Sequence, residues 1–471
     1  MVFSSLFFLY FFLPLNIILY FASKSKAVKN AVLLTFSLVF YAWGRIPWML
    51  MLVFTAFLDY SNAKVIEKYR GTFKAKLAIF ATLLVDIGIF VGFKYTGFLA
   101  ENFNLLSPVD IPVPQIALPI GISFYTFQTL TYVIDVYRGV CKPQRSFFKY
   151  LLYLSMYFQL VAGPIVRYTD VEKEIEHRDL SVSMAAEGAQ RFICGLAKKA
   201  IIADTAAEIV KMYMDTDISN LSTLAAWLGS LMYIIQLYFD FSGYSDMAIG
   251  LGKIFGFKFP ENFNYPYISK SVGEFWRRWH MTLGSFFRDY VYIPLGGNRK
   301  RVFFNLFVVW FLTGFWHGAS WNFVIWGLYN GFFIMAERLL KKWFEKLPAF
   351  IRHIYLIVVV DIGFVFFYHS DLGKAVDYIK VMFGHGGNLM NSYPDVKITF
   401  MNNVFFILLA AVLCMPVSQK LKELAARFES VSPLRAYIAE TVKFAALLVI
   451  LLVCTAFLAG NSFSPFLYYQ F

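Results

Sequence analysis

The sequence predicts an all-α, polytopic membrane protein, and three features of the chain support that prediction. Its 471 residues are 59% hydrophobic and only 15% charged, with a mean hydropathy of +0.59. Soluble domains carry about 25% charged residues, so this chain has too little charge to be one. Many apolar runs reach the roughly 17–25 residues that a helix needs to cross a bilayer. The third feature is the clustering of basic residues in the short segments between these runs.

The apolar runs offer twelve candidate spans, from which we predict roughly 11 spanning helices. In chain order, the candidate spans lie near residues 3–21, 28–43, 47–59, 77–94, 119–137, 147–165, 221–241, 303–316, 321–337, 354–369, 400–417 and 443–459.

The charges between the spans predict their orientation. Lysine and arginine concentrate in segments that we place on the cytoplasmic side, namely 22–30, 60–76, 138–149, 338–352 and 418–443. No lysine or arginine occurs between Lys94 and Arg138, and no charged residue follows Lys443. We therefore expect a multi-pass protein of the cell (cytoplasmic) membrane with both termini extracytoplasmic.

The middle of the chain, about 164–302, does not fit a simple up-and-down count because it mixes apolar pieces with charges. Irregular segments survive at membrane depth only where protein or a water-filled cavity surrounds them. We expect re-entrant and in-plane helices here, forming the interior of the protein. No Pro/Gly/Ser-rich linker divides the chain, so residues 1–471 are predicted to form a single domain.

The net charge of +13 could indicate nucleic-acid binding. The basic residues, however, lie in short loops between spans, and no nucleic-acid recognition module is visible. The lipid bilayer is therefore the predicted partner, and no nucleic acid is expected.

His317 is the most informative single residue, because it lies at the turn between two apolar runs. A titratable ring at membrane depth is costly and usually functional, and imidazole exchanges a proton near neutral pH. Gly314 and Gly318 leave space beside the ring for a substrate or for neighbouring backbone. Trp316 and Trp321 are candidates for the walls of a narrow cavity. The alternative is a hydrogen-bonded structural histidine in an aromatic belt.

A second candidate segment spans residues 274–290. Apolar side chains recur there at helical spacing and form one face, comprising Trp276, Trp279, Leu283, Phe286, Phe287 and Tyr290. His280 flanks this face as a second candidate catalytic or orienting histidine. Arg277, Arg278 and Arg288 border it as candidate ligands for the phosphates of a nucleotide-like donor. An interfacial amphipathic helix explains the pattern equally well, and the sequence does not show that His280 and His317 meet.

Asp240 and Asp246 lie near the end of another apolar run. The preferred interpretation is that they pair with the arginines of the 274–290 segment, and contact with a donor or substrate is the second. Asn322 and Trp316, which flank the His317 turn, join the candidate substrate- or donor-binding residues. The chain contains no G-x-S-x-G elbow, P-loop, G-x-G-x-x-G or H-E-x-x-H motif, and we expect no metal site.

Taken together, these segments resemble the membrane-bound O-acyltransferase superfamily. The resemblance rests on Trp276-Arg-Arg-Trp-His280, on Arg288-Asp-Tyr-Val-Tyr-Ile-Pro-Leu-Gly-Gly-Asn-Arg299 and on Trp316-His-Gly-Ala-Ser-Trp321. Three further strings resemble its alginate O-acetyltransferase branch more than the branch that D-alanylates teichoic acids: Leu118-Pro-Ile-Gly-Ile-Ser-Phe-Tyr-Thr-Phe-Gln128, Gln159-Leu-Val-Ala-Gly-Pro-Ile-Val-Arg167 and Phe239-Asp-Phe-Ser-Gly-Tyr-Ser-Asp-Met-Ala-Ile-Gly250. The resemblance reaches at least residue 337 and is most diagnostic over about 118–337.

The resemblance implies a ring of spanning helices around a thin core with a central tunnel. His317 matches the family's membrane-embedded catalytic histidine, and His280 matches its second active-site histidine. It also implies acyl transfer from a cytoplasmic thioester, with acetyl-CoA as the default donor and no bound cofactor. The implied acceptor is a hydroxyl of an exported polysaccharide, reached through an extracytoplasmic acetyltransferase partner.

Two rivals remain at this point. One is a transporter whose polar core lines a solute path, although no internal repeat supports it. The other is a structural subunit of a polysaccharide export complex, for which replacing His280 and His317 would be harmless.

Overall fold

The structure is a computed structural model that describes residues 1–386, 393–460 and 466. It is built from helices, and no β-strand occurs in these ranges, which confirms the all-α prediction. Six helices are long and apolar enough to cross a membrane: α3 (Ile46–Lys68), α4 (Phe73–Lys94), α12 (Thr223–Ile254), α18 (Ala349–Tyr368), α20 (Tyr393–Leu413) and α22 (Pro433–Gly460). The chain is therefore a multi-pass membrane protein, while roughly 11 spans remain a prediction.

The described residues fall into two compact units. The first comprises residues 1–192 and 244–261, and the second comprises 193–243 together with the described residues from 262 onward. Helix α12 begins in the second unit and ends in the first. The single domain expected from the sequence remains a prediction.

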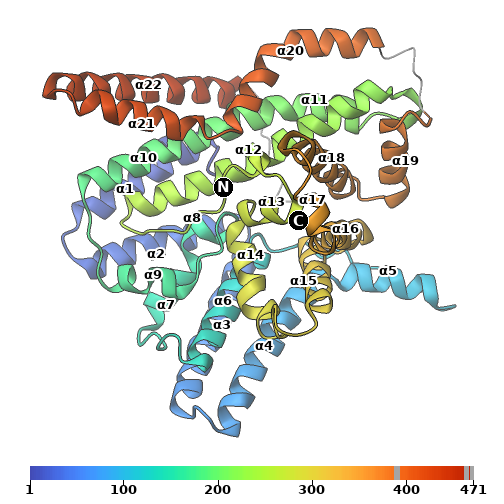
Figure 1. Ribbon diagram of the computed structural model, residues 1–471. Helices are drawn as coiled ribbons and strands as arrows, with labels where there is room; N and C mark the ends of the chain where they lie inside the picture. The colour runs from blue at the N-terminus through green and yellow to red at the C-terminus, as the bar shows by residue number, and fades with distance from the viewer. Residues whose placement is uncertain (387–392, 461–465, 467–471) are drawn as a thin grey trace. The chain divides into compact units, whose positions relative to one another are not determined.

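The first unit contains the N-terminal helices, which are the blue to green ribbons of Figure 1. They are α1 (Leu13–Ala22), α2 (Lys26–Ala42), α3, α4, α5 (Thr96–Leu106), α6 (Ile122–Arg138), α7 (Phe147–Ser155), α8 (Tyr157–Leu160), α9 (Tyr168–Glu176) and most of α10 (Val182–Ala197). Helices α3, α4 and α6 pack on one another. Buried hydroxyl groups link helices of this unit: the Thr129 hydroxyl on α6 donates to Asp86 on α4 over 2.9 Å, and the Tyr150 hydroxyl on α7 donates to Asp59 on α3 over 3.5 Å.

The run 147–165 is not one continuous helix, contrary to the sequence prediction. Helix α7 ends at Ser155, and the extended backbone of Met156 separates it from the single turn of α8. The backbone N–H of Tyr157 donates to the hydroxyl of Ser37 over 3.3 Å. A side chain on α2 thus satisfies an amide released by the break, which the apolar run itself did not reveal.

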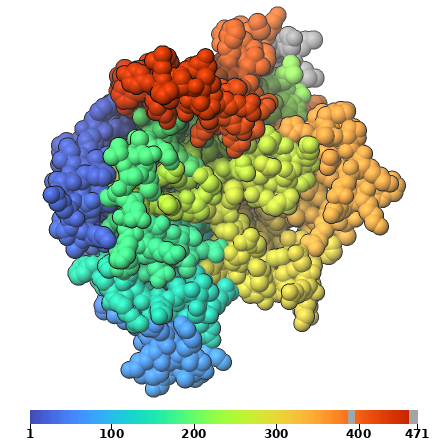
Figure 2. Space-filling model, turned by 60° about the vertical axis from the view of Figure 1, so that its left-hand side comes forward, coloured from blue at the N-terminus to red at the C-terminus, as the bar shows by residue number. Residues whose placement is uncertain are grey.

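The second unit contains the remaining helices. They are α11 (Asp204–Met214), the first part of α12, α13 (Val272–Arg278), α14 (Met281–Phe287), α15 (Val302–His317), α16 (Trp321–Leu339), α17 (Lys341–Phe344), α18, α19 (Leu372–Met382), α20, α21 (Val417–Glu429) and α22. Helices α15 and α16 form an antiparallel hairpin, and α18 packs on α16 (Figure 1). Helices α21 and α22 pack together and are largely exposed, and they form the red surface of Figure 2.

The middle of the chain is made of short, interrupted helices around the long helix α12. This agrees with the irregular segments expected there, but their tilt relative to a bilayer remains a prediction. The orientation of both termini also remains a prediction, and most of the segment after Gly460 lies outside the described residues.

Candidate functional site

The α15–α16 hairpin holds His317 at the last residue of α15. Gly314 and Gly327 bring the two helices into backbone contact. A Cβ on Gly314 would lie 2.4 Å from the carbonyl oxygen of Phe323, and one on Gly327 would lie 2.4 Å from that of Trp310. Small residues of this kind let membrane helices approach closely. The space at Gly314 that the sequence indicated is therefore taken by neighbouring backbone.

His317 is buried in a wall of aromatic rings. Its ring centroid lies 4.8 Å from that of Trp326, with an interplanar angle of 86°, and 5.3 Å from that of Phe367. The ring of Trp316 contacts it edge-on, with centroids 4.8 Å apart and an interplanar angle of 70°. Only 4% of His317 is exposed. A ring in these surroundings is shielded from water, so it can exchange a proton with a substrate without competition from solvent.

His280 lies at a break in the 274–290 segment rather than along one continuous helix. Helix α13 ends at Arg278 and α14 begins at Met281, because His280 adopts the left-handed backbone conformation with φ 46° and ψ 54°. Such a conformation is uncommon for a residue other than glycine and persists only where surrounding contacts enforce it. The helical spacing of Trp276, Trp279 and Leu283 therefore predicted a longer helix than the structure contains.

Hydrogen bonds to two side chains of α16 hold α13 against that helix. The carboxylate of Glu337 accepts hydrogen bonds from the backbone N–H groups of Val272 and Gly273, over 2.6 and 3.0 Å. These are first-turn amides that a helix cannot satisfy by itself. The indole N–H of Trp276 donates to the Oδ1 of Asn330 over 3.0 Å. The helix that leads into His280 is thereby held against the helix that follows His317.

The two histidines meet at Trp316. The ring centroids of His280 and Trp316 are 6.2 Å apart, and Trp316 also contacts His317 edge-on. Phe241 of α12 contacts His280 edge-on at 4.8 Å. Burial lowers the pKa of His280 to about 3, so its imidazole is neutral at physiological pH. The structure thus places both predicted histidines in one buried, aromatic site.

The three arginines border this segment at the surface. Arg278 pairs with Glu274 at 3.0 Å, and Arg288 pairs with Asp289 at 2.7 Å. Arg277 is exposed. Exposed ion pairs are weak and exchange readily, so these guanidinium groups can still bind a soluble anionic donor.

The prediction that Asp240 and Asp246 pair with those arginines is wrong. Asp240 lies 2.8 Å from the Nζ of Lys199, and Asp246 lies 2.8 Å from the guanidinium of Arg191. Lys199 also pairs with Asp204 at 2.8 Å, which completes a buried triad. The basic partners lie before α11 in the chain, and no pattern in the sequence indicated these ion pairs. Asp240 therefore acts as a partner of a buried lysine, and Asp246 as a partner of a half-buried arginine.

Asn322 and Trp321 differ in burial although they are neighbours in sequence. Asn322 is 1% exposed, and its Nδ2 donates to the carbonyl of Phe366 over 3.0 Å. Its Oδ1 accepts no hydrogen bond from the described residues. Trp321 is half exposed, whereas Trp316, the other candidate wall residue, lines the histidine site. The central tunnel remains a prediction.

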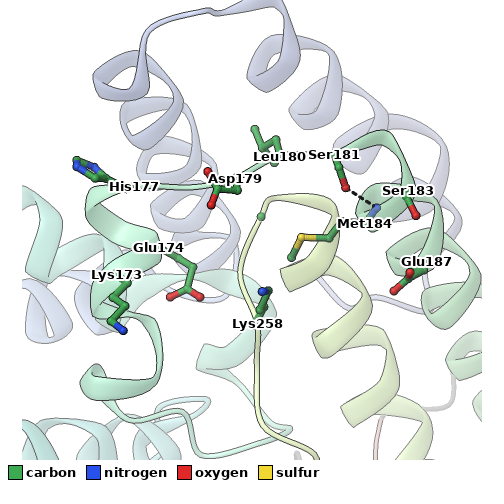
Figure 3. A pocket seen from close by; sticks show the side chains of 11 residues that line it. Lys173, Glu174, His177, Asp179, Leu180, Ser181, Ser183, Met184, Glu187 and Lys258 are labelled. Carbon is green, nitrogen blue, oxygen red and sulfur yellow. Dashed lines mark hydrogen bonds between the residues drawn. The ribbon is translucent and has the colours of Figure 1, made fainter.

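A separate cavity of about 530 Å³ lies in the first unit (Figure 3). Its walls come from α9, the start of α10 and the turn after α12, with Lys173, Glu174, His177, Asp179, Glu187 and Lys258 among the lining residues. No site residue predicted from the sequence is among the residues that line it. Its lining mixes acidic and basic groups, and it has no part in the histidine site.

Several residues of the histidine site were missed by the sequence analysis. Phe241, Trp326 and Phe367 contact the two histidines, and Asn262 binds the Nδ1 of His280 over 3.0 Å. Because 20% of the residues in the chain are aromatic, nothing in the sequence distinguishes these three rings from the others. Asn262 lies in a loop without a recognisable motif, so no sequence signal singled it out.

Comparisons with known proteins agree with this geometry. Residues 142–371 match the model of the membrane-bound O-acyltransferase family, MBOAT. The chain is 39% identical to the probable alginate O-acetylase AlgI of Azotobacter vinelandii, over 88% of this chain and 84% of that protein. It is 34% identical to the peptidoglycan O-acetyltransferase of Helicobacter pylori, over 86% and 84%. It is 31% identical to the teichoic acid D-alanyltransferase of Bacillus subtilis, over 53% and 67%. The matched family region contains both buried histidines and Trp316 between them. The chain belongs to the membrane-bound O-acyltransferase family and is an O-acyltransferase.

Proposed function

We propose that this protein moves an acetyl group from a cytoplasmic thioester, acetyl-CoA, across the cell membrane to hydroxyl groups of an exported polysaccharide. The observation that carries the proposal is the burial of His280 and His317 against one shared ring, Trp316. Two titratable rings in an apolar wall are costly to a membrane protein unless they act on a substrate.

In the proposed reaction, His317 removes the proton of the acceptor hydroxyl as its oxygen attacks the thioester carbonyl. The carbon–oxygen bond forms and the carbon–sulfur bond breaks. The proton then passes from the imidazolium of His317 to the departing thiolate, so no net proton is gained or lost. General-base help of this kind contributes about 10²–10⁴-fold in rate. His280 orients the donor or the acceptor from the other side of Trp316.

The donor, the acceptor and the partner are proposed from different observations. The exposed guanidinium groups of Arg277 and Arg288 suit the phosphates of acetyl-CoA. Asn322 offers a buried acceptor oxygen for a substrate hydroxyl. Relatives named for alginate and peptidoglycan favour a polysaccharide acceptor. The exported polymer is reached through an extracytoplasmic acetyltransferase partner, a hydroxyl of which receives the acetyl group first.

The test is thiol release from acetyl-CoA by the purified protein in nanodiscs, with a small sugar alcohol as surrogate acceptor. We expect the wild type to release thiol and the His317→Ala variant to lose about 10²-fold or more of that rate. His385→Ala is the matched control, because it removes an exposed imidazole of the same unit. If His317→Ala keeps the wild-type rate at equal expression, the proposed base is wrong.

The same preparation separates acyl transfer from transport. Proteoliposomes with labelled acetyl-CoA outside should yield acetylated acceptor inside together with free thiol outside. Flux of a solute without thiol release would contradict the proposal and favour a transporter. If replacing both histidines changes neither thiol release nor solute flux, the two rings have no catalytic role. That result would favour a structural subunit of an export complex.

A further inference from the structure

Asn262 holds three consecutive residues at the break between α13 and α14. Its Oδ1 lies 3.0 Å from the Nδ1 of His280 and accepts a hydrogen bond from the Thr282 hydroxyl over 2.8 Å. Its backbone carbonyl accepts from the N–H of Met281 over 2.9 Å. Asn262 is 1% exposed. These contacts enforce the left-handed backbone of His280 and fix the plane of its ring.

The contact with Asn262 decides which ring nitrogen of His280 carries the proton. An amide Oδ1 only accepts hydrogen bonds, and the Thr282 hydroxyl already donates to it. The Nδ1 of His280 must therefore donate, which places its proton on Nδ1. In a neutral imidazole the lone pair then lies on Nε2.

The ring is neutral in the folded protein because burial lowers the pKa of His280 to about 3. The side chains in contact with it include Asn262, Phe241 and Trp316, and none of these three titrates near neutral pH. An asparagine amide satisfies Nδ1–H without bringing in a negative charge. An aspartate at the same place would stabilise the imidazolium instead.

We propose that Asn262 is a positioning residue of the acyltransferase reaction, which holds His280 as the Nδ1-protonated tautomer with Nε2 as its basic nitrogen. This inference rests on the proposed function of His280 in acyl transfer. It adds a residue that makes no contact with the reacting atoms and acts only through the ring that does.

The first test reads the tautomer directly in the wild-type protein. The chain has only six histidines, so ¹⁵N-histidine labelling in nanodiscs gives few signals, and His280→Ala identifies the one that belongs to His280. We expect a protonated Nδ1 and an unprotonated Nε2 from pH 5 to pH 8. A signal with the proton on Nε2, or an imidazolium in this range, would overturn the inference.

The second test measures the pH dependence of acetyl transfer in Asn262→Asp. The new carboxylate raises the pKa of His280, so the ring stays protonated to higher pH and Nε2 loses the lone pair with which it orients the substrate. We expect the loss relative to wild type to be about tenfold greater at pH 5.5 than at pH 8. The matched control is Thr282→Val, which removes the hydroxyl that donates to the same Oδ1 and should leave the shape of the pH profile unchanged. An equal loss at every pH in Asn262→Asp would show a packing role only and overturn the inference.

The two tests separate this inference from the proposed function. If His280→Ala abolishes transfer but the wild-type ring carries its proton on Nε2, only the role of Asn262 fails. If the tautomer is as expected but His280→Ala transfers at the wild-type rate, the role of His280 in acyl transfer fails, and the positioning role fails with it.

Discussion

Two buried polar clusters in the second unit differ in how the free-energy cost of burying their polar groups is offset. Around Lys199, the charges compensate one another, since its ammonium lies 2.8 Å from both Asp204 and Asp240. Around His280 and His317, the neighbours of the two imidazoles include the aromatic rings of Phe241, Trp316, Trp326 and Phe367.

The difference indicates what each cluster does. A compensated triad lowers the cost of burying its own charges and mainly fixes the packing of α11 and α12. A neutral titratable ring enclosed by rings contributes little to stability and is left able to exchange a proton. We therefore assign structure to the Lys199 triad and chemistry to the histidine site, and the following predictions test that division.

The largest change in stability is expected when the triad loses its cation. Lys199→Met leaves two buried carboxylates without their partner, which should lower the free energy of unfolding by roughly 3–5 kcal/mol. Thermal unfolding in nanodiscs measures the loss. The control is His317→Phe, which replaces one buried ring by another and should unfold near the wild-type temperature. Equal unfolding temperatures for wild type and Lys199→Met would contradict the structural role of the triad.

The second effect is a pH dependence that belongs to the histidine site. Below pH 6.5, His280 binds a proton in the unfolded chain. In the folded protein the ring stays neutral, because its pKa is about 3. Stability therefore falls as the pH falls, by roughly 2 kcal/mol between pH 7 and pH 5. The variant His280→Gln lacks this proton, so the difference in unfolding temperature between it and wild type should narrow toward pH 5. A constant difference would show that the pKa of His280 is the same in the folded and unfolded states, contrary to the burial of its ring.

The smallest effect is expected when the exposed side chain of Arg288 is replaced. Arg288→Gln breaks a surface pair with Asp289 and should change the free energy of unfolding by less than about 1 kcal/mol. If Arg288 binds a donor phosphate, the KM for acetyl-CoA should rise while kcat stays close to wild type. Lys341→Gln, which breaks another exposed pair, is the control and should change neither. An unchanged KM in Arg288→Gln would remove Arg288 from the donor site.

The sequence predicted the parts of the site that depend on local patterns. The cost of an imidazole at membrane depth singled out His317, and the glycines around it indicated close helix packing, which Gly314 confirms. The all-α class followed from the apolar runs. Each of these features depends on residues that are close together in the chain.

The features that the sequence did not predict depend on contacts between distant segments. The spacing of Trp276, Trp279 and Leu283 favoured one helix, but Asn262 binds across the break and holds His280 in a left-handed conformation. Asp246 pairs with Arg191, which is 55 positions earlier, and no periodicity reports such a pair. Local propensity was overridden by tertiary contacts in both cases.

The most direct test of the central claim, that His280 and His317 form one acyl-transfer site, is a double-mutant comparison of thiol release. Wild type, His280→Ala, His317→Ala and the double variant are assayed in the same nanodiscs at equal concentration and verified fold. Residues that act as a unit are strongly non-additive, so we predict that the double variant is little worse than His317→Ala alone. Losses that multiply independently, or no loss in either single variant, would contradict the account.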